Sequence, residues 1–185
     1  MTRFRLHLLR HGEPELTGVM LGRTDSPATA QGIAACVARA EGLAVARRIS
    51  SDLSRARACA EAIGPATVDP RWRELDFGAW DGLPPDSIDP AARARFWDDP
   101  DANPPPEGER WSDLVARVGA AIAELPPEPT LVVTHGGAMR AALAALCGFD
   151  AHTVWGFALP YSSLLTLEIW EGAPRTAQVT GLVTA

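Results

Sequence analysis

The chain has 185 residues, of which 46% are hydrophobic and 22% charged, and its formal net charge is −6. This length is enough for one well-packed domain and short for two, so we expect a single domain over residues 1–185. An acidic chain is a poor match for nucleic acid or an anionic membrane surface, and no apolar run approaches the ~20 residues of a membrane span.

Composition also sets expectations for compartment and chemistry. The first apolar stretch is too short and too polar for a signal peptide, so the expected location is the cytoplasm. Cys36, Cys59 and Cys147 lack CxxC spacing, and we expect buried thiols in a reducing compartment rather than a thiol-based metal or redox site. All 17 basic residues are Arg, so any side-chain cation that holds a phosphate is a guanidinium.

The first part of the chain alternates strand and helix patterns. Residues 4–10 (FRLHLLR) predict a strand, residues 29–44 a helix and residues 45–50 a second strand. Residues 51–64 predict a helix with Ser51 and Asp52 as capping residues and Gly64 at its end. Residues 66–70 predict a short strand.

Residues 76–108 hold most of the Asp-Pro and Pro-Pro steps of the chain. Such a Pro-rich segment is either a disordered insert or a folded excursion. We favour a folded lid with one short helix around residues 90–98, because Phe96 and Trp97 need burial. Trp80 and Trp97 are candidates to line a pocket for a flat substrate group.

The remainder predicts an amphipathic helix over 110–125, a buried strand at TLVV (130–133), a tight turn at THGG and a helix ending at Gly148. Residues 163–170 and 176–183 predict two closing strands. This alternation indicates an α/β sheet, mostly parallel, with helices on both faces. Ligands bind such sheets at the carboxyl ends of the strands, where Arg10, His11 and His135 fall. His7 alternates with leucines inside its strand and is expected to be structural.

Four motifs occur in order: LRHGE (9–13), SSDLSRA (50–56), RELDFGAWDG (73–82) and VTHGG (133–137). Together they resemble the histidine phosphatase superfamily, with its phosphoglycerate-mutase-like fold. The resemblance implies a three-layer α/β/α sandwich with a mostly parallel central sheet and a Pro-rich lid insert. The short length, the DFGAWDG segment and the tail WGFALPYSSLLTLEI are most similar to the α-ribazole phosphatase branch.

The resemblance implies that His11 is the nucleophile and becomes a phosphohistidine. A neutral imidazole serves this purpose when one ring nitrogen is held by a backbone carbonyl, and Gly12 allows the tight turn. Arg10 and Arg55 match the phosphate-pocket arginines, whereas Arg57 is expected to be an ordinary surface residue. The alternative for His11 is a polar residue that marks a turn, and for Arg55 an exposed arginine paired with an acid.

The same resemblance gives His135 a contact with the phosphate, to which the Gly136 amide can also donate. Its alternative is a plain helix-capping residue. Glu74 matches the general acid that protonates the leaving oxygen and then acts as a base on water. Asp76 is a rival acid in the same stretch. Alternatively, Glu74 forms an ion pair with Arg71 or Arg73.

The substrate loop is less well defined. LGRTD (21–25) occupies the place of a family substrate loop, so Gly22 and Arg23 are candidate substrate-binding residues, although Arg23 fits a plain surface arginine equally well. Thr17 stands where many relatives have Asn, which leaves the substrate open.

The expected function is therefore hydrolysis of a small phosphorylated metabolite, with α-ribazole 5′-phosphate as one candidate and no metal or other cofactor. The alternatives are phosphoglycerate mutase-type transfer, a phosphatase of another sugar or glycerate phosphate, and a non-catalytic binding module on the same fold. Mutases would need extra basic residues in the lid, which has Arg93, Arg95 and Arg110 among many acids. Nucleic-acid and membrane partners are not expected, and a homodimer is left open.

Overall fold

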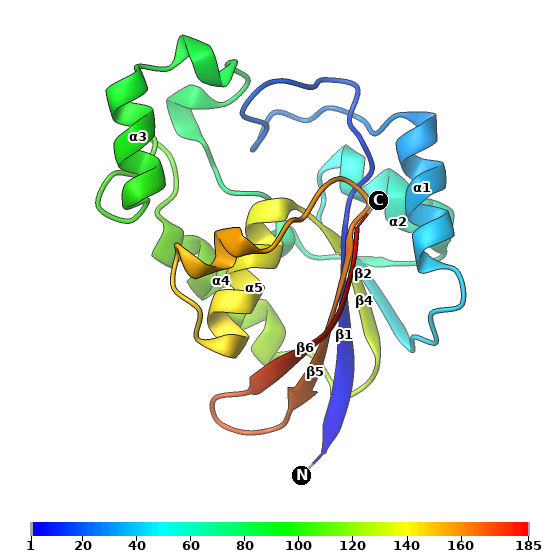
Figure 1. Ribbon diagram of the computed structural model, residues 1–185. Coiled ribbons are helices and arrows are strands. Elements are labelled where there is room, and N and C mark those ends of the chain that lie inside the picture. The colour runs from blue at the N-terminus through cyan, green and yellow to red at the C-terminus, as the bar shows by residue number, and fades with distance from the viewer. Residues whose placement is uncertain (1, 185) are drawn as a thin grey trace.

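A six-stranded sheet runs through the computed structural model, which describes residues 2–184 (Figure 1). Its order is β3-β2-β4-β1-β5-β6. The strands are β1 (Arg3–Arg10), β2 (Arg47–Ser50), β3 (Thr67–Val68), β4 (Thr130–Thr134), β5 (Leu164–Trp170) and β6 (Thr176–Val183). The first four pair in parallel, and β5 and β6 form an antiparallel hairpin that joins β1 at its other side. The mostly parallel sheet and the closing hairpin are confirmed.

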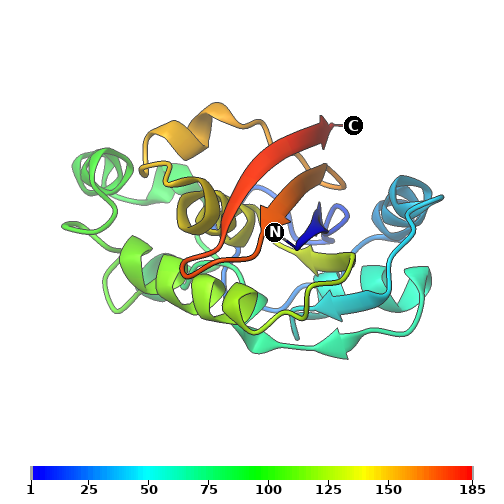
Figure 2. The same cartoon turned by 90° about the horizontal axis from the view of Figure 1, so that it is seen from below.

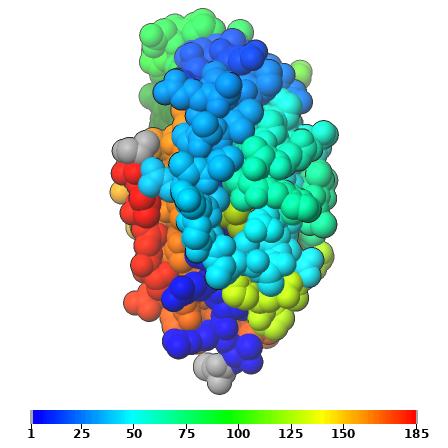
Figure 3. All heavy atoms as spheres, turned by 90° about the vertical axis from the view of Figure 1, so that its right-hand side faces the viewer, coloured from blue at the N-terminus to red at the C-terminus, as the bar shows by residue number. Residues whose placement is uncertain are grey.

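Two layers of helices cover the sheet. The helices are α1 (Ala30–Ala40), α2 (Ser54–Ile63), α3 (Pro90–Asp98), α4 (Trp111–Ala123) and α5 (Gly136–Cys147). Figure 2 shows α1 and α2 on one face and α4 and α5 on the other, and Figure 3 shows α1 and α2 from outside. Because successive strand side chains point to opposite faces, Leu8 of β1 packs with the α4–α5 core and Leu9 with the α1–α2 core. The predicted three-layer sandwich is confirmed.

The Pro-rich segment folds into a lid that stands above the carboxyl ends of the parallel strands (Figure 1). It contains two short 3-10 turns and α3, which begins at Pro90 as predicted. Phe96 is buried, and Trp80 packs against it with ring centroids 5.6 Å apart. Trp80 is therefore a core residue and not a pocket wall. Trp97 lies at the surface of the lid with 40% of its area exposed, so the expectation of burial is wrong for it.

The structure also corrects the start of α2. This helix begins at Ser54, and neither Ser51 nor Asp52 caps it; the residue at the cap position is Leu53, which makes no side-chain cap. Ser51 and Asp52 instead bind other parts of the site, as described below. No helix within residues 2–184 is both long and apolar enough to span a membrane.

Candidate active site

His11 follows β1 directly and is fixed by backbone bonds to two other segments. Its N–H donates to the carbonyl of Thr134 at the end of β4 (2.9 Å), and its own carbonyl accepts from Ser162 (3.1 Å). The next residue must be glycine, because a Cβ on Gly12 would overlap the backbone of Gly32 in α1. The first and fourth parallel strands thus end in one place, as the sheet rule predicts.

The His11 imidazole is buried and orientated for attack by one nitrogen. Its Nδ1 lies 2.7 Å from the Gly12 carbonyl, which can only accept, so Nδ1 carries the proton and Nε2 has the free lone pair. Burial, with the charges of Arg55 and Arg10, holds the pKa of His11 well below its usual 6.5. A neutral imidazole with a free Nε2 can attack phosphorus at ordinary pH.

His135 lies opposite His11, with the two ring centroids 4.9 Å apart. Its Nε2 is 2.7 Å from the hydroxyl of Ser51, which also accepts the N–H of Leu53 (3.3 Å). When the Ser51 hydroxyl donates to Nε2, the proton of His135 sits on Nδ1, which has no partner among residues 2–184. That nitrogen can then donate to a phosphate oxygen. Ser51 is therefore a positioning residue for His135.

Two arginines flank the histidine pair, the half-buried Arg10 and the fully buried Arg55. Arg10 places its guanidinium 4.3 Å from the ring centroid of Tyr161 and donates to the carbonyl of Leu159. Arg55, in the first turn of α2, is completely buried and donates to backbone carbonyls of the loop at residues 21–24. Neither arginine makes an ion pair within residues 2–184, so the alternative of an exposed Arg55 paired with an acid is wrong. Arg57, by contrast, pairs with Glu61 on the surface, as expected.

Two uncompensated guanidinium groups next to neutral imidazoles give the centre a positive potential. Such a centre attracts a phosphate dianion, and the forked guanidinium geometry matches its oxygens. Burial of the Arg55 guanidinium without a carboxylate partner is costly unless an anion binds, so this arrangement is typical of an anion site rather than of a packed core.

Glu74 lies on the other side of the centre and faces α5. Its carboxylate accepts the backbone N–H of Gly137 (2.8 Å) and of its neighbour Leu75 (3.0 Å). A Cβ on Gly137 would overlap this carboxylate, so the glycine in THGG makes room for it.

The ion pair considered for Glu74 does not form. Arg71 pairs with Asp69 and Glu124, and Arg73 pairs with Asp52. The carboxylate of Glu74 is thus left to face the cavity described below.

The rival acid and the predicted substrate loop lie apart from the Glu74 carboxylate. Asp76 accepts the N–H of Gly78 (2.9 Å) and pairs with Arg23 at 3.3 Å. Asp81 binds the backbone N–H groups of Gly22, Arg23 and Thr24. The loop therefore reaches the centre through the carbonyl of Gly22, which Arg55 binds, and not through a free guanidinium of Arg23.

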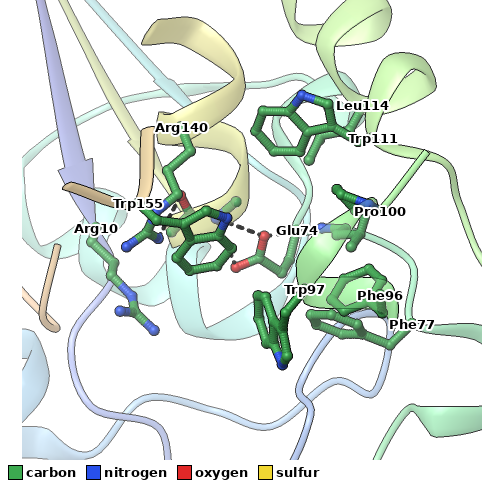
Figure 4. Close-up of a pocket in the computed structure, with 13 residues that line it drawn as sticks. Arg10, Glu74, Phe77, Phe96, Trp97, Pro100, Trp111, Leu114, Arg140 and Trp155 are labelled. Atoms are coloured by element: carbon green, nitrogen blue, oxygen red, sulfur yellow. Dashed lines mark hydrogen bonds between the residues drawn. The ribbon is translucent and has the colours of Figure 1, made fainter. Parts of the chain in front are cut away.

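A cavity of about 230 Å³ opens next to the histidine centre (Figure 4). Its polar side holds Arg10, Glu74, Arg140 and the backbone of Gly136. Its remaining wall is mostly aromatic and comes from the lid, from α4 and from the segment after α5. The Glu74 carboxylate lies in the middle of these side chains (Figure 4). Asp76, Gly22 and Arg23 do not line this cavity.

Several residues that touch the centre or line the cavity were not predicted from sequence. Ser51 and Tyr161 touch the histidine and arginine groups, and Arg140 and Trp155 line the cavity. Ser51 stood inside a quoted motif but was assigned to a helix cap. Tyr161 and Trp155 stood in the quoted tail without a role, because nothing local in the sequence indicates that this tail crosses the carboxyl ends of the strands.

The three buried histidines predict a loss of stability in mild acid. Burial, above all other causes, lowers the pKa of His7, His11 and His135 below 6.5 in the folded chain. Below pH 6.5 the unfolded chain therefore binds more protons, and the free energy of unfolding falls as the pH falls. Between pH 7.5 and pH 5.5 we expect a decrease of up to about 1.4 kcal/mol for each histidine that stays neutral in the folded chain, measured by urea unfolding.

A matched control for this prediction is His7→Gln, which removes one buried histidine outside the centre. Its loss over the same pH interval should be smaller by about 1 kcal/mol. A free energy of unfolding that stays constant from pH 7.5 to 5.5 in the native chain would contradict the assignment of neutral buried imidazoles.

The fold and centre define an α/β protein in which paired histidines and two arginines gather at the carboxyl ends of a parallel sheet. The model of the histidine phosphatase superfamily (branch 1) matches residues 6–180. The chain therefore belongs to the histidine phosphatase superfamily.

Individual relatives agree with this membership. A protein of Yersinia pestis (strain Pestoides F) named "Probable phosphoglycerate mutase GpmB" is 34% identical, over 90% of this chain and 86% of the relative. A mycobacterial glucosyl-3-phosphoglycerate phosphatase has a similar structure, with a TM-score of 0.86 and 28% identity over 96% of this chain and 97% of that one. An Escherichia coli K-12 protein, provisionally described as an alpha-ribazole-5′-P phosphatase, has a TM-score of 0.79 and 26% identity over 95% of both chains.

Proposed function

We propose that this chain hydrolyses phosphomonoesters of small-molecule alcohols through a phosphohistidine on His11. The observation that carries the proposal is the buried imidazole pair: a neutral His11 with Nε2 free, 4.9 Å from His135 and flanked by Arg10 and Arg55. A nucleophile, a hydrogen-bond donor and two unpaired cations at one point are what phosphoryl transfer to nitrogen requires.

Two steps complete the reaction. Nε2 of His11 attacks phosphorus, the bond to the ester oxygen breaks, and Glu74 gives that oxygen a proton. Water then attacks the phosphohistidine and returns a proton to Glu74, the phosphorus–nitrogen bond breaks, and inorganic phosphate leaves. Arg10, Arg55 and His135 stabilise the charge on the transferred oxygens throughout. The sequence of steps requires no metal or other cofactor.

Splitting hydrolysis in this way is physically useful. Uncatalysed hydrolysis of phosphate monoesters is among the slowest biological reactions, so a catalyst must lower a very large barrier. A covalent intermediate replaces one difficult displacement with two easier ones, each in the field of the same fixed cations.

The relatives suggest three candidates for the particular reaction that this chain catalyses. The expectation of α-ribazole 5′-phosphate is supported by the description of one structural neighbour, and a phosphate of a glycerate derivative by that of another. Mutase activity is supported by the name of the Yersinia relative. Two of the lid arginines favour water as the acceptor, because Arg93 binds Asp86 and Arg110 binds the carbonyl of Asp101, so neither is directed at the cavity.

The experiment that tests the proposal follows the fate of the phosphoryl group. Incubation with a panel that includes α-ribazole 5′-phosphate and 3-phosphoglycerate, with EDTA present, should release inorganic phosphate. An acid-labile, base-stable phosphoprotein should appear after a rapid quench. Conversion of 3-phosphoglycerate to 2-phosphoglycerate without free phosphate would establish the mutase instead.

Glu74→Gln should slow hydrolysis according to how much the leaving oxygen needs a proton. For an alkyl phosphate, kcat should fall by about 100-fold or more, because general-acid catalysis contributes that much. For p-nitrophenyl phosphate the decrease in phosphoenzyme formation should be far smaller, because its leaving group is weakly basic. Asp76→Asn is the matched control and should show no such dependence on the leaving group. The reverse pattern would make Asp76 the acid.

A further inference from the structure

The cavity next to Glu74 has an apolar, largely aromatic wall that has no role in the proposed phosphoryl transfer. Five aromatic side chains line it: Phe77, Phe96, Trp97, Trp111 and Trp155. The cavity reaches from Arg10 at the phosphate side, past the Glu74 carboxylate, to this wall (Figure 4). The alcohol part of a substrate whose phosphate lies at the histidines would therefore enter it.

Two exposed tryptophans form the outer part of the wall. Trp97 belongs to α3 of the lid and Trp155 to the 3-10 turn Thr153–Gly156 that follows α5, and their ring centroids are 4.7 Å apart in an edge-to-face contact. The exposed fractions of these side chains are 40% and 44%. Two large apolar surfaces that meet at the edge of a cavity, and remain half exposed there, are typical of a binding site for an apolar group.

Trp155 is held in place by a cation. The guanidinium of Arg140 lies 4.1 Å from its ring centroid and donates to the carbonyls of Gly136 (3.3 Å) and Phe157 (3.2 Å). Trp97 is held from the other side by Phe96, at 4.8 Å between centroids. The wall is therefore preorganised, which reduces the entropy lost when a ligand binds.

The side chains of the aromatic wall offer a ligand few hydrogen-bond donors and no strong acceptor. The Glu74 carboxylate already accepts two backbone N–H groups, and the terminal nitrogens of Arg140 already donate to carbonyls. A sugar would bury several hydroxyls here with few partners, which is costly. A cavity of about 150 Å³ holds one benzene ring, so 230 Å³ is enough for a ring and a short linker.

We propose that this cavity is a leaving-group site that selects phosphomonoesters whose alcohol carries a planar apolar ring, with Trp155 and Trp97 as its specificity-determining residues. The inference rests on the proposed phosphatase function and specifies its substrate class. The ring lies against the two indoles, and the ester oxygen lies within reach of Glu74. Arg140 acts as a positioning residue for Trp155.

The test compares 2-phenylethyl phosphate with ethyl phosphate. Both leaving groups are simple primary alcohols of similar basicity, so the ratio of their kcat/KM values reports recognition of the ring and not ease of bond breaking. We expect a ratio of about 30 or more, from the apolar area that one ring buries. Glucose 6-phosphate should be a poorer substrate than 2-phenylethyl phosphate.

Variants show which side chains cause the preference for the ester that carries a ring. Trp155→Ala should lower the ratio by about tenfold, and Trp155→Phe should restore most of it because a ring is kept. Trp170→Ala is the matched control: Trp170 lies at the far end of β5, paired with Arg3, and its loss should leave the ratio unchanged. The unfolding midpoint of each variant shows that it is folded.

Each outcome is informative. A ratio near one in the native chain, or an unchanged ratio in folded Trp155→Ala, overturns the leaving-group site while the phosphatase function stands. Failure to release phosphate from either ester and from p-nitrophenyl phosphate overturns the phosphatase function itself.

Discussion

Replacement of His11 by alanine is expected to lower kcat/KM for p-nitrophenyl phosphate by at least about 10,000-fold, the scale seen when a covalent nucleophile is removed. The phosphoprotein trapped by a rapid quench should disappear as well. The physical reason is that Nε2 of His11 is the free lone pair at the centre, since Nδ1 is committed to the Gly12 carbonyl. Nε2 of the neighbouring His135 faces the Ser51 hydroxyl instead.

His7→Ala is the control for this experiment. His7 is also buried and lies on β1, the strand that His11 follows, but its Nδ1 bonds to the hydroxyl of Thr166 at 3.0 Å, on the neighbouring strand β5. Its replacement should lower stability and leave kcat/KM within a few-fold of the native value. Phosphoprotein that persists in folded His11→Ala would disprove the nucleophile assignment.

Replacement of Arg55 by methionine is expected to lower kcat/KM by about 1,000-fold, because a fixed arginine at a transferring phosphoryl group contributes at least that much. It should also lower the free energy of unfolding by about 3 kcal/mol. Arg55 is fully buried and donates to the carbonyls of Leu21, Gly22 and Thr24, which would lose their donors.

The chain offers a matched control two residues further along α2. Arg57→Met removes the same charge from the exposed side of the helix, where Arg57 pairs only with Glu61. Its effect on stability should stay within about 0.5 kcal/mol and its effect on kcat/KM should be slight. Arg55→Lys separates charge from geometry: it keeps the cation and loses the fork, so activity equal to the native value would show that the fork is not needed.

The arrangement of the chain explains why one site can hold both a nucleophile and cations without collapsing. Arg10 and Arg55 are anchored by carbonyls and by the Tyr161 ring rather than by carboxylates. Their charge is therefore directed to the centre and is not neutralised before a phosphate arrives. Burial, above all, and these same charges lower the pKa of His11, so the arrangement proposed to bind the phosphate also favours a neutral His11.

Several elements of this protein are determined by local sequence. The strand RFRLHLLR and the strand TLVVT end at Arg10 and Thr134, next to the histidines, because apolar runs stop where glycine allows a turn. A parallel sheet then brings these two ends together by topology alone. The helix at residues 90–98 also follows from local signals, with Asp89 as its cap and Pro90 in its first turn.

The tertiary structure decided which partners several polar side chains bind. Ser51 and Asp52 have the composition of a helix cap, yet one binds His135 and the other Arg73, because these partners come from other segments of the chain. Glu74 and Asp76 are rival acids in the sequence, where only the family resemblance favours Glu74. Only the packing of α5 against residues 73–76 directs the first to the cavity and leaves the second with Arg23.

The sequence by itself thus determined the fold class and the family, and it predicted that His11 and His135 lie where two parallel strands end, since these depend on motif order and on where strands end. The leaving-group cavity was decided by tertiary structure alone. Its wall joins Trp97 of the lid to Trp155 beyond α5, two residues 58 positions apart whose contact depends on long-range packing. Periodicity and propensity act over a few residues and carry no information about such a contact.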